Sequence, residues 1–306
     1  FDKAMDCFNE IMPYMFDFEK CEPKVSPSRI QNTSALVSLL TDIYECDEKE
    51  NLKYLYLASR FADFLIENQK EDGAYYNRNT HYTCVIYIAK SILELSIAEK
   101  KSDDAFLNEK GERHYNSIKL AINDLALKLD NIQTEGEQTL EDGMISCSAL
   151  QMGMFALTLP VNLREKYINA AEYMIRIHNC LEQNLIPDCR MRGASLRFWE
   201  GQYDVMIRAN FFSSPHGWSA WTGYAYYYLY MLTGKREYLV HFMNVMSACI
   251  QLMDENGNLS WAFCAQPYVK AEALVKDKAI KNCGYAFSKE LGNSFSGKYT
   301  ILEFGE

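Results

Sequence analysis

The sequence predicts an all-α protein in which a ring of inner helices is enclosed by outer helices. The first observation is a shortage of turn residues, because 15 glycines and 7 prolines in 306 residues disfavour a turn-rich β-sandwich. The second is apolar spacing of the helical kind, which continues up to residue 253. The third is an alternation between helices that are apolar nearly all round and helices with one apolar stripe. A helix without a polar face is surrounded by protein, so the alternation predicts inner and outer helices.

Nine helical segments follow from that spacing and from the turn residues between them. Their ranges are 2–16, 31–45, 51–69, 82–99, 112–129, 143–158, 162–180, 215–232 and 236–253. From the second segment onward the two kinds alternate, which gives four pairs of an inner and an outer helix. The last outer helix carries an apolar stripe that we expect to face the core, made of Leu239, Phe242, Met243, Met246, Ile250 and Met253.

The lengths of the connections predict where function lies. An inner helix is mostly joined to its outer helix by a short loop, at 46–50, 159–161 and 233–235, with 100–111 as the exception. An outer helix is joined to the next inner helix by a longer loop, at 70–81, 130–142 and 181–214. Antiparallel hairpins place these long loops and the N-termini of the inner helices on one rim. Long loops on a rigid scaffold usually carry function, so this rim is the expected site.

Two stretches depart from the helical pattern. Residues 194–212 predict a short β-hairpin flap over the rim, and residues 299–304 read as a C-terminal strand. We expect one helical domain over 1–306, with a β-rich continuation of a longer chain as the alternative. The chain begins at Phe1 without a charged and then apolar leader, so either a signal peptide was trimmed or this is a piece of a longer protein.

The composition of the chain excludes some classes of binding partner. A net charge of −10 disfavours nucleic acid and anionic membrane surfaces, because phosphate binding needs basic patches. The sequence contains no run of 18 apolar residues, so it predicts no transmembrane helix. The ten cysteines include no C-x-x-C pair, which excludes a zinc-ribbon site and a thioredoxin-like redox motif. Free thiols are therefore favoured. We therefore expect a cytoplasmic location, with a periplasmic or secreted one as the alternative if a leader was removed.

The sharpest candidate motif is the segment SSPHGWSAW at 213–221, which opens an inner helix. Ser214 is a good N-cap, and His216 falls in the first turn, where the helix dipole favours neutral imidazole. Such a histidine can take a proton from a substrate or donate to its oxygen. Trp218, Trp221 and Tyr224 offer ring faces that suit the apolar face of a sugar. The structural alternative is a capped helix with its aromatic residues in the core.

Two adjacent carboxylates, Glu141 and Asp142, stand at the start of another inner helix. Acidic groups there are stabilised by the helix dipole, which explains them without any catalytic role. A pair of carboxylates in a cleft is also what glycosidic-bond hydrolysis requires, one as acid and one as base or nucleophile. Adjacent residues rarely face one site, so we expect at most one of them to be catalytic.

Further candidates lie in the flap and before the inner helix at 82–99. Arg190, Arg192 and Arg197 form a local basic excess that suits a carboxylate ligand, although internal salt bridges explain them equally. The remaining candidates for substrate contact are Trp199, Tyr203, His81 and Tyr82. His114, His178 and His241 lie on outer helices and are expected to be structural or exposed. No phosphate loop, zinc motif or calcium loop occurs, so we expect no cofactor and no metal.

On these residues the chain resembles the (α/α) toroid carbohydrate-active enzymes, the six-hairpin glycosidase-like superfamily of glycoside hydrolases and related polysaccharide lyases. The resemblance covers residues 30–265 and rests on the inner and outer helices, the Asp-Gly turns at the rim and the aromatic stretch from Ser213 to Leu239. It implies an (α/α) toroid or an incomplete barrel, with an oligosaccharide or polysaccharide substrate across the N-termini of the inner helices. The chain departs from the pattern in having four clear helix pairs instead of six.

Three functions remain open. In a glycoside hydrolase, Glu141 or Asp142 would be the acid or base, with Glu200 or Asp204 as its partner. In a polysaccharide lyase, the arginines would neutralise a uronate carboxylate, and His216 or a tyrosine would remove the α-proton. The third possibility is a non-catalytic helical module that binds a glycan or a partner. We expect an enzyme, and hydrolysis of an oligosaccharide that carries an acidic sugar is the first choice.

Overall fold

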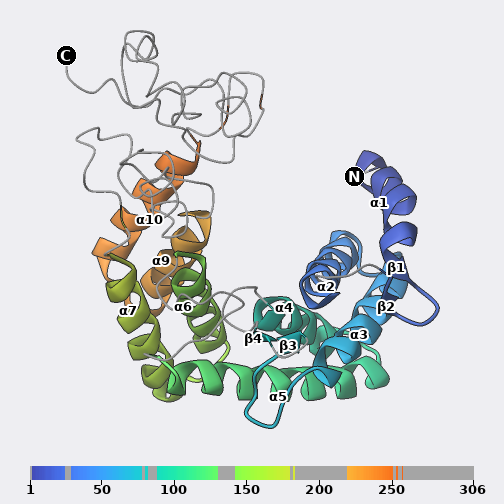
Figure 1. Ribbon diagram of the computed structural model, residues 1–306, viewed down its shortest axis with the longest axis horizontal. Coiled ribbons are helices and arrows are strands. Elements are labelled where there is room, and N and C mark those ends of the chain that lie inside the picture. The colour runs from blue at the N-terminus through green and yellow to red at the C-terminus, as the bar shows by residue number, and fades with distance from the viewer. Residues whose placement is uncertain are drawn as a thin grey trace, which may run out of the picture. The chain divides into compact units, whose positions relative to one another are not determined.

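The computed structural model describes residues 2–24, 29–77, 80–81, 88–129, 142–179, 182, 219–250, 253 and 257. The predicted all-α class is confirmed, because these residues form nine α-helices, one short 3-10 helix (η1, Val161–Leu163) and two small two-stranded sheets (Figure 1). None of these helices combines the length and the apolarity needed to cross a membrane. The helices are α1 (Asp2–Met15), α2 (Arg29–Cys46), α3 (Leu52–Glu67), α4 (Ile88–Lys101), α5 (Ala105–Leu127), α6 (Asp142–Leu157), α7 (Glu165–His178), α9 (Ser219–Thr233) and α10 (Arg236–Ile250).

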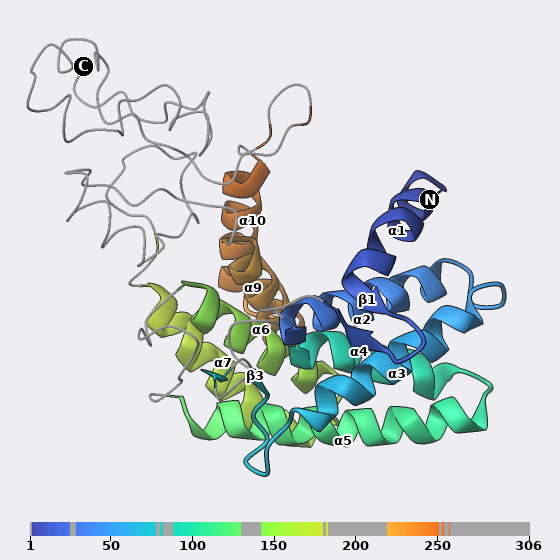
Figure 2. The same ribbon diagram turned by 45° about the vertical axis from the view of Figure 1, so that its right-hand side comes forward.

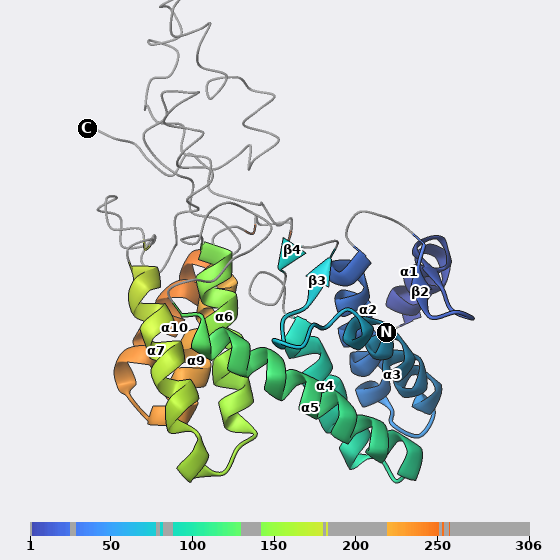
Figure 3. The same ribbon diagram turned by 60° about the horizontal axis from the view of Figure 1, so that its bottom comes forward.

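Helix pairs of the predicted kind build two compact units, Phe1–Thr139 and Leu140–Glu306. In the first unit, each inner helix packs on its outer partner, α2 on α3 and α4 on α5, and the inner helices α2 and α4 pack on each other (Figure 2). In the second unit, α6 packs on α7, α9 on α10, and the inner helices α6 and α9 pack on each other (Figure 3). The prediction of one toroid domain over 1–306 stays a prediction.

The first unit is held by an apolar core between its two helix hairpins. Val37, Leu40, Phe61, Leu65 and Ile92 are fully enclosed there. Burying a side chain of this size contributes about 1.5–3 kcal/mol relative to leaving it in water. The core therefore fixes α2, α3, α4 and α5 as one block and determines which polar groups are enclosed with them.

Helix α5 begins earlier than the sequence predicts. The expected loop at 100–111 shrinks to residues 102–104, and the helix starts at Ala105 with Asp104 as its N-cap, whose carboxylate accepts from the amides of Phe106 and Leu107. The prediction was wrong because Gly111 reads as a helix break. In the fold Gly111 lies inside α5, where a β-carbon would come within 2.7 Å of Lys100 Cγ and 3.0 Å of Glu99 Cβ. The glycine thus lets α4 and α5 approach closely.

The apolar stripe predicted for the last outer helix does not face the core. Met243 and Ile250 are 58% and 60% exposed, whereas Val245 and Ala248 are buried. Gly223 of α9 lets α10 approach closely, since a β-carbon there would lie 3.2 Å from a methyl carbon of Val245. Phe242 of the stripe also contacts α9, with its ring 5.1 Å from that of Tyr227, so the contact uses only part of the predicted stripe.

The first long loop confirms one turn signal and contains a short hairpin. Gly73 has φ +98°, and its amide donates to the carbonyl of Lys70 at 2.9 Å, so the Asp-Gly pair forms a tight turn. The chain then forms a hairpin of β3 (Tyr76–Asn77) and β4 (Thr80–His81), in register Tyr76 with His81. The other hairpin pairs β1 (Phe16–Asp17) with β2 (Glu22–Pro23). His81 thus lies in a strand, and the described part of α4 runs from Ile88 to Lys101.

Candidate functional site

Most of the candidate residues from the sequence lie outside the described residues, namely Tyr82, Glu141, Arg190, Arg192, Arg197, Trp199, Tyr203, His216 and Trp218. The predicted flap and C-terminal strand also lie outside them. Asp142 is the first residue of α6, which is a favourable position for an acidic group. The side chains that the structure describes are those of Trp221 and Tyr224, both on α9.

An aromatic face runs along α9 and includes one ring of α10. We define it by Tyr224, Tyr227 and Tyr228 of α9 and Phe242 of α10. Tyr224 and Tyr227 are 51% and 39% exposed, although an inner helix was expected to be surrounded by protein. The rings of Tyr224 and Tyr228 lie 6.4 Å apart, and those of Tyr227 and Phe242 lie 5.1 Å apart. Trp221 lies one turn earlier and is half-buried. The helical spacing of three and four residues therefore aligns several rings on one surface.

A polar cluster around the buried Tyr226 fixes the other side of α9, and no pattern in the sequence indicates it. The Tyr226 hydroxyl donates to Glu182 Oε1 at 2.6 Å and to Asn179 Oδ1 at 3.2 Å. The His241 ring stacks on the Tyr226 ring at 4.8 Å. Burial, reinforced by the charge of Glu182, raises the pKa of Tyr226. The hydroxyl therefore stays protonated and serves as a hydrogen-bond donor, which makes it unsuitable as a base.

The first turns of α9 are tied to the end of α7 by a second polar contact. His178 Nε2 lies 3.1 Å from Thr222 Oγ1, and both side chains are buried. His178 was expected to be structural or exposed, and its burial between two helices agrees with a structural role. Together with Tyr226, this contact fixes the rotation of α9 about its axis, which decides that Tyr224 points outward.

A cavity of about 380 Å³ lies in the first unit, lined by the ends of α2 and α4 and the loops that follow them. Its walls carry Glu48, Asp103 and Asp104 together with Lys49 and Lys101. No candidate residue from the sequence lines it. It lies beside short loops, whereas the candidates belong to long ones. Among the described residues, no three acidic, histidine or cysteine side chains are arranged to hold a metal ion.

Comparison with known proteins assigns no family to this chain. No protein-family model matches the chain, and no curated protein matches it. One solved structure that it resembles is a polysaccharide lyase, with a TM-score of 0.46 and 18% sequence identity. The match covers 81% of this chain and 44% of the lyase chain, so this chain spans less than half of that protein's length. A likeness at this level assigns neither a family nor an activity to the chain.

Proposed function

We propose that this chain is part of a carbohydrate-active enzyme that cleaves a glycosidic bond, with its oligosaccharide lying across the aromatic face of α9. The observation that supports the proposal is the exposure of Tyr224 and Tyr227 on an inner helix. Rings of this kind offer a flat apolar surface and a polar edge, which match the C–H face and the hydroxyl rim of a sugar. Half-exposed rings fixed from behind are a surface that suits binding better than core packing.

For the chemistry, we propose hydrolysis with Glu141 or Asp142 as the acid or base. Helix α6, which begins at Asp142, packs on α9, and Gly153 of α6 contacts Tyr228 of α9. The predicted alternation of inner and outer helices requires α6 and α9 to run in the same direction, so that both helices begin on the same side. A carboxylate at the start of α6 would then lie on the side from which α9 also begins.

The second candidate is β-elimination on a uronate-containing polysaccharide. It is favoured by the close sequence spacing of Arg190, Arg192 and Arg197 in an otherwise acidic chain. A guanidinium binds a carboxylate through two parallel hydrogen bonds and so stabilises the charge that develops when the α-proton leaves. His216 would be the group that removes this proton.

One experiment separates the two reactions. The protein is incubated with neutral and with uronate-containing oligosaccharides, and each product is measured for new reducing ends and for ultraviolet absorbance. Hydrolysis gives reducing ends alone, whereas β-elimination adds an absorbing double bond. We expect Glu141→Gln or Asp142→Asn to abolish hydrolysis, whereas loss of activity in His216→Ala alone would favour elimination. Binding without either product would contradict cleavage and leave a glycan-binding module.

The aromatic face allows a prediction of its own. Tyr224→Ala should weaken oligosaccharide binding roughly tenfold, because one aromatic contact contributes about 0.5–1.5 kcal/mol beyond its buried area. The free energy of unfolding should barely change, since the ring is half-exposed. Titration calorimetry measures the first quantity and urea unfolding the second. Tyr14→Ala is the matched control, because Tyr14 is an exposed tyrosine on α1, and an equal loss in both variants would contradict the proposed surface.

A further inference from the structure

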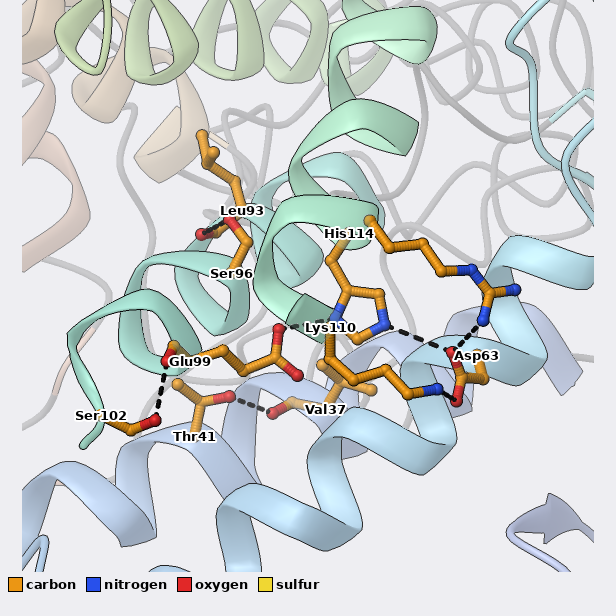
Figure 4. A network of polar contacts seen from close by, with 10 residues as sticks. Val37, Thr41, Asp63, Leu93, Ser96, Glu99, Ser102, Lys110 and His114 are labelled. Atoms are coloured by element: carbon orange, nitrogen blue, oxygen red, sulfur yellow. Dashed lines mark hydrogen bonds and ion pairs between the residues drawn. The ribbon is translucent and has the colours of Figure 1, made fainter. Parts of the chain in front are cut away.

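Three helices of the first unit meet at one histidine (Figure 4). His114 of α5 places its Nδ1 atom 2.6 Å from Glu99 Oε2 on α4 and its Nε2 atom 3.5 Å from Asp63 Oδ1 on α3. The side chains of His114 and Glu99 are 0% exposed, and that of Asp63 is 22% exposed. Each nitrogen of the ring therefore faces a carboxylate from a different helix.

The two carboxylates determine whether the imidazole ring of His114 carries one proton or two. A neutral imidazole carries one N–H and can donate to one carboxylate, whereas an imidazolium carries two. With a neutral ring, the lone pair of one nitrogen would point at a carboxylate oxygen. His114 Nε2 makes no hydrogen bond, so its contact with Asp63 is an ion pair at 3.5 Å, and both contacts are attractive together only when the ring holds both protons.

The other charged groups around the ring divide unequally between the two carboxylates. Asp63 is also bound by two cations of α5, Lys110 at 2.6 Å and Arg113 at 3.1 Å. Burial raises the pKa of the Cys21 thiol, which lies in the turn between β1 and β2, and the charge of Asp63 adds to this rise. Lys100 of α4 is engaged elsewhere, with Glu112 of α5 at 2.8 Å.

Glu99 depends on the histidine to a greater degree. Within the described part of the chain, its ion-pair partner is His114, and its other oxygen, Oε1, is buried without a hydrogen bond. Helix α2, the remaining helix of the block, contributes Thr41 near this cluster, whose hydroxyl donates to the carbonyl of Val37. The charge of Glu99 is therefore balanced in the interior by one group that can lose its proton.

We propose that Glu99, His114 and Asp63 form a proton-dependent clamp that locks α4 and α5 onto α3 while the imidazole ring carries both protons, and that loosens when one proton is lost. A neutral ring can still donate its one N–H to Glu99, but the ion pair between α4 and α5 is lost, whereas Asp63 keeps its two other cations. Gly111 stands one turn before His114 on α5, where an added β-carbon would come within 3.0 Å of Glu99 Cβ on α4.

The direction of the titration agrees with the clamp. Burial alone lowers the pKa of His114, but the contacts with Asp63 and Glu99 outweigh it, so the pKa lies above the ordinary value of 6.5. A raised pKa means that the contribution to stability is complete below about pH 6.5 and is lost as the pH rises through the folded-state pKa. Asp63 sets the acid limit, because burial is outweighed by contacts with His114 and Lys110, and its pKa is lowered. Its contribution is lost as the pH falls through that lowered value.

The test uses the full chain and amide hydrogen exchange of α4 and α5 between about pH 5 and pH 9, corrected for the intrinsic rise in exchange with pH. In the wild type, we expect the corrected protection of these two helices to fall as the pH rises through the alkaline part of this range, because the raised pKa of His114 places the loss of its second proton there. In His114→Gln the corrected protection should not vary with alkaline pH. His241→Gln, at a half-exposed histidine of the second unit, should behave as the wild type.

A direct measurement keeps the proposal falsifiable even if His114→Gln does not fold. The ring carbons of His114 report its protonation by nuclear magnetic resonance in the wild-type protein. A ring that is neutral at pH 6 overturns the clamp, and so does corrected protection of α4 and α5 that stays constant up to pH 9. The clamp does not depend on the proposed carbohydrate activity, because it requires neither substrate nor catalysis.

Discussion

Replacing Glu99 with alanine is expected to lower the free energy of unfolding of the first unit by about 3–5 kcal/mol. The change leaves the buried His114 ring opposite Asp63 alone and creates a gap between α4 and α5 where the carboxylate stood. Removing one partner of a buried pair is costly because the remaining charge keeps its desolvation penalty. All four tryptophans lie beyond residue 139, so fluorescence follows the second unit, and exchange of α4 and α5 amides under urea measures the first.

The matched control for this prediction lies on the same helix and carries the same charge. Glu94 is 28% exposed and pairs with Lys90 one turn earlier at 2.6 Å. Glu94→Ala should cost about 1–2 kcal/mol, because the variant loses a partly exposed pair with Lys90 and the hydrogen bond that Ser38 Oγ donates to Glu94 Oε2 at 3.1 Å. If the two variants were equally destabilised, burial of Glu99 would not be the source of the effect.

Replacing Gly73 with alanine should destabilise the first unit by about 3 kcal/mol. Its φ of +98° is unfavourable for any residue with a β-carbon, and that carbon would lie 2.5 Å from the carbonyl oxygen of Leu120. This neighbour is backbone of α5, so relief requires a shift of the helix or of the turn. Exchange of α5 amides and the midpoint of urea unfolding measure the loss.

Gly234 separates the two causes at Gly73. It also has positive φ, +69°, but an added β-carbon there meets no atom within 4 Å. Gly234→Ala should therefore cost roughly 1 kcal/mol, the price of the backbone conformation alone. A loss at Gly73 no larger than that at Gly234 would show that the contact with α5 relaxes freely.

The helices were predictable from the sequence because burial imposes a period on it. The alternation of inner and outer helices is repeated in the packing of α2 with α3, α4 with α5, α6 with α7 and α9 with α10. Two features were not predictable. Gly111 has the same local signature as a loop glycine, and only the position of α4 shows that it lies in a helix. The face of α10 depends on Gly223 of another helix, which the pattern of α10 itself does not contain.

The predicted site stays a prediction. Tyr224 is exposed on α9 and Asp142 is the first residue of α6, while the roles of both in binding and catalysis are untested. The polar clusters around Tyr226 and His114 escaped prediction, since their members come from segments far apart in the chain. A histidine on an outer helix carries no local sign of which carboxylates the fold will bring to it. The catalytic assignments for Glu141, Asp142 and His216 stay predictions.

The glycine at the crossing of α4 and α5 has a consequence for how the first unit folds. A glycine inside a helix costs about 1 kcal/mol relative to alanine, so the N-terminal turns of α5 are poor helix formers by themselves. Their stabilising contact exists only once α4 is in place against residue 111. A peptide of residues 105–127 should therefore show helicity mainly after Gly111, with its first turns frayed. The two helices then form as one cooperative step, and neither serves as a preformed template for the other.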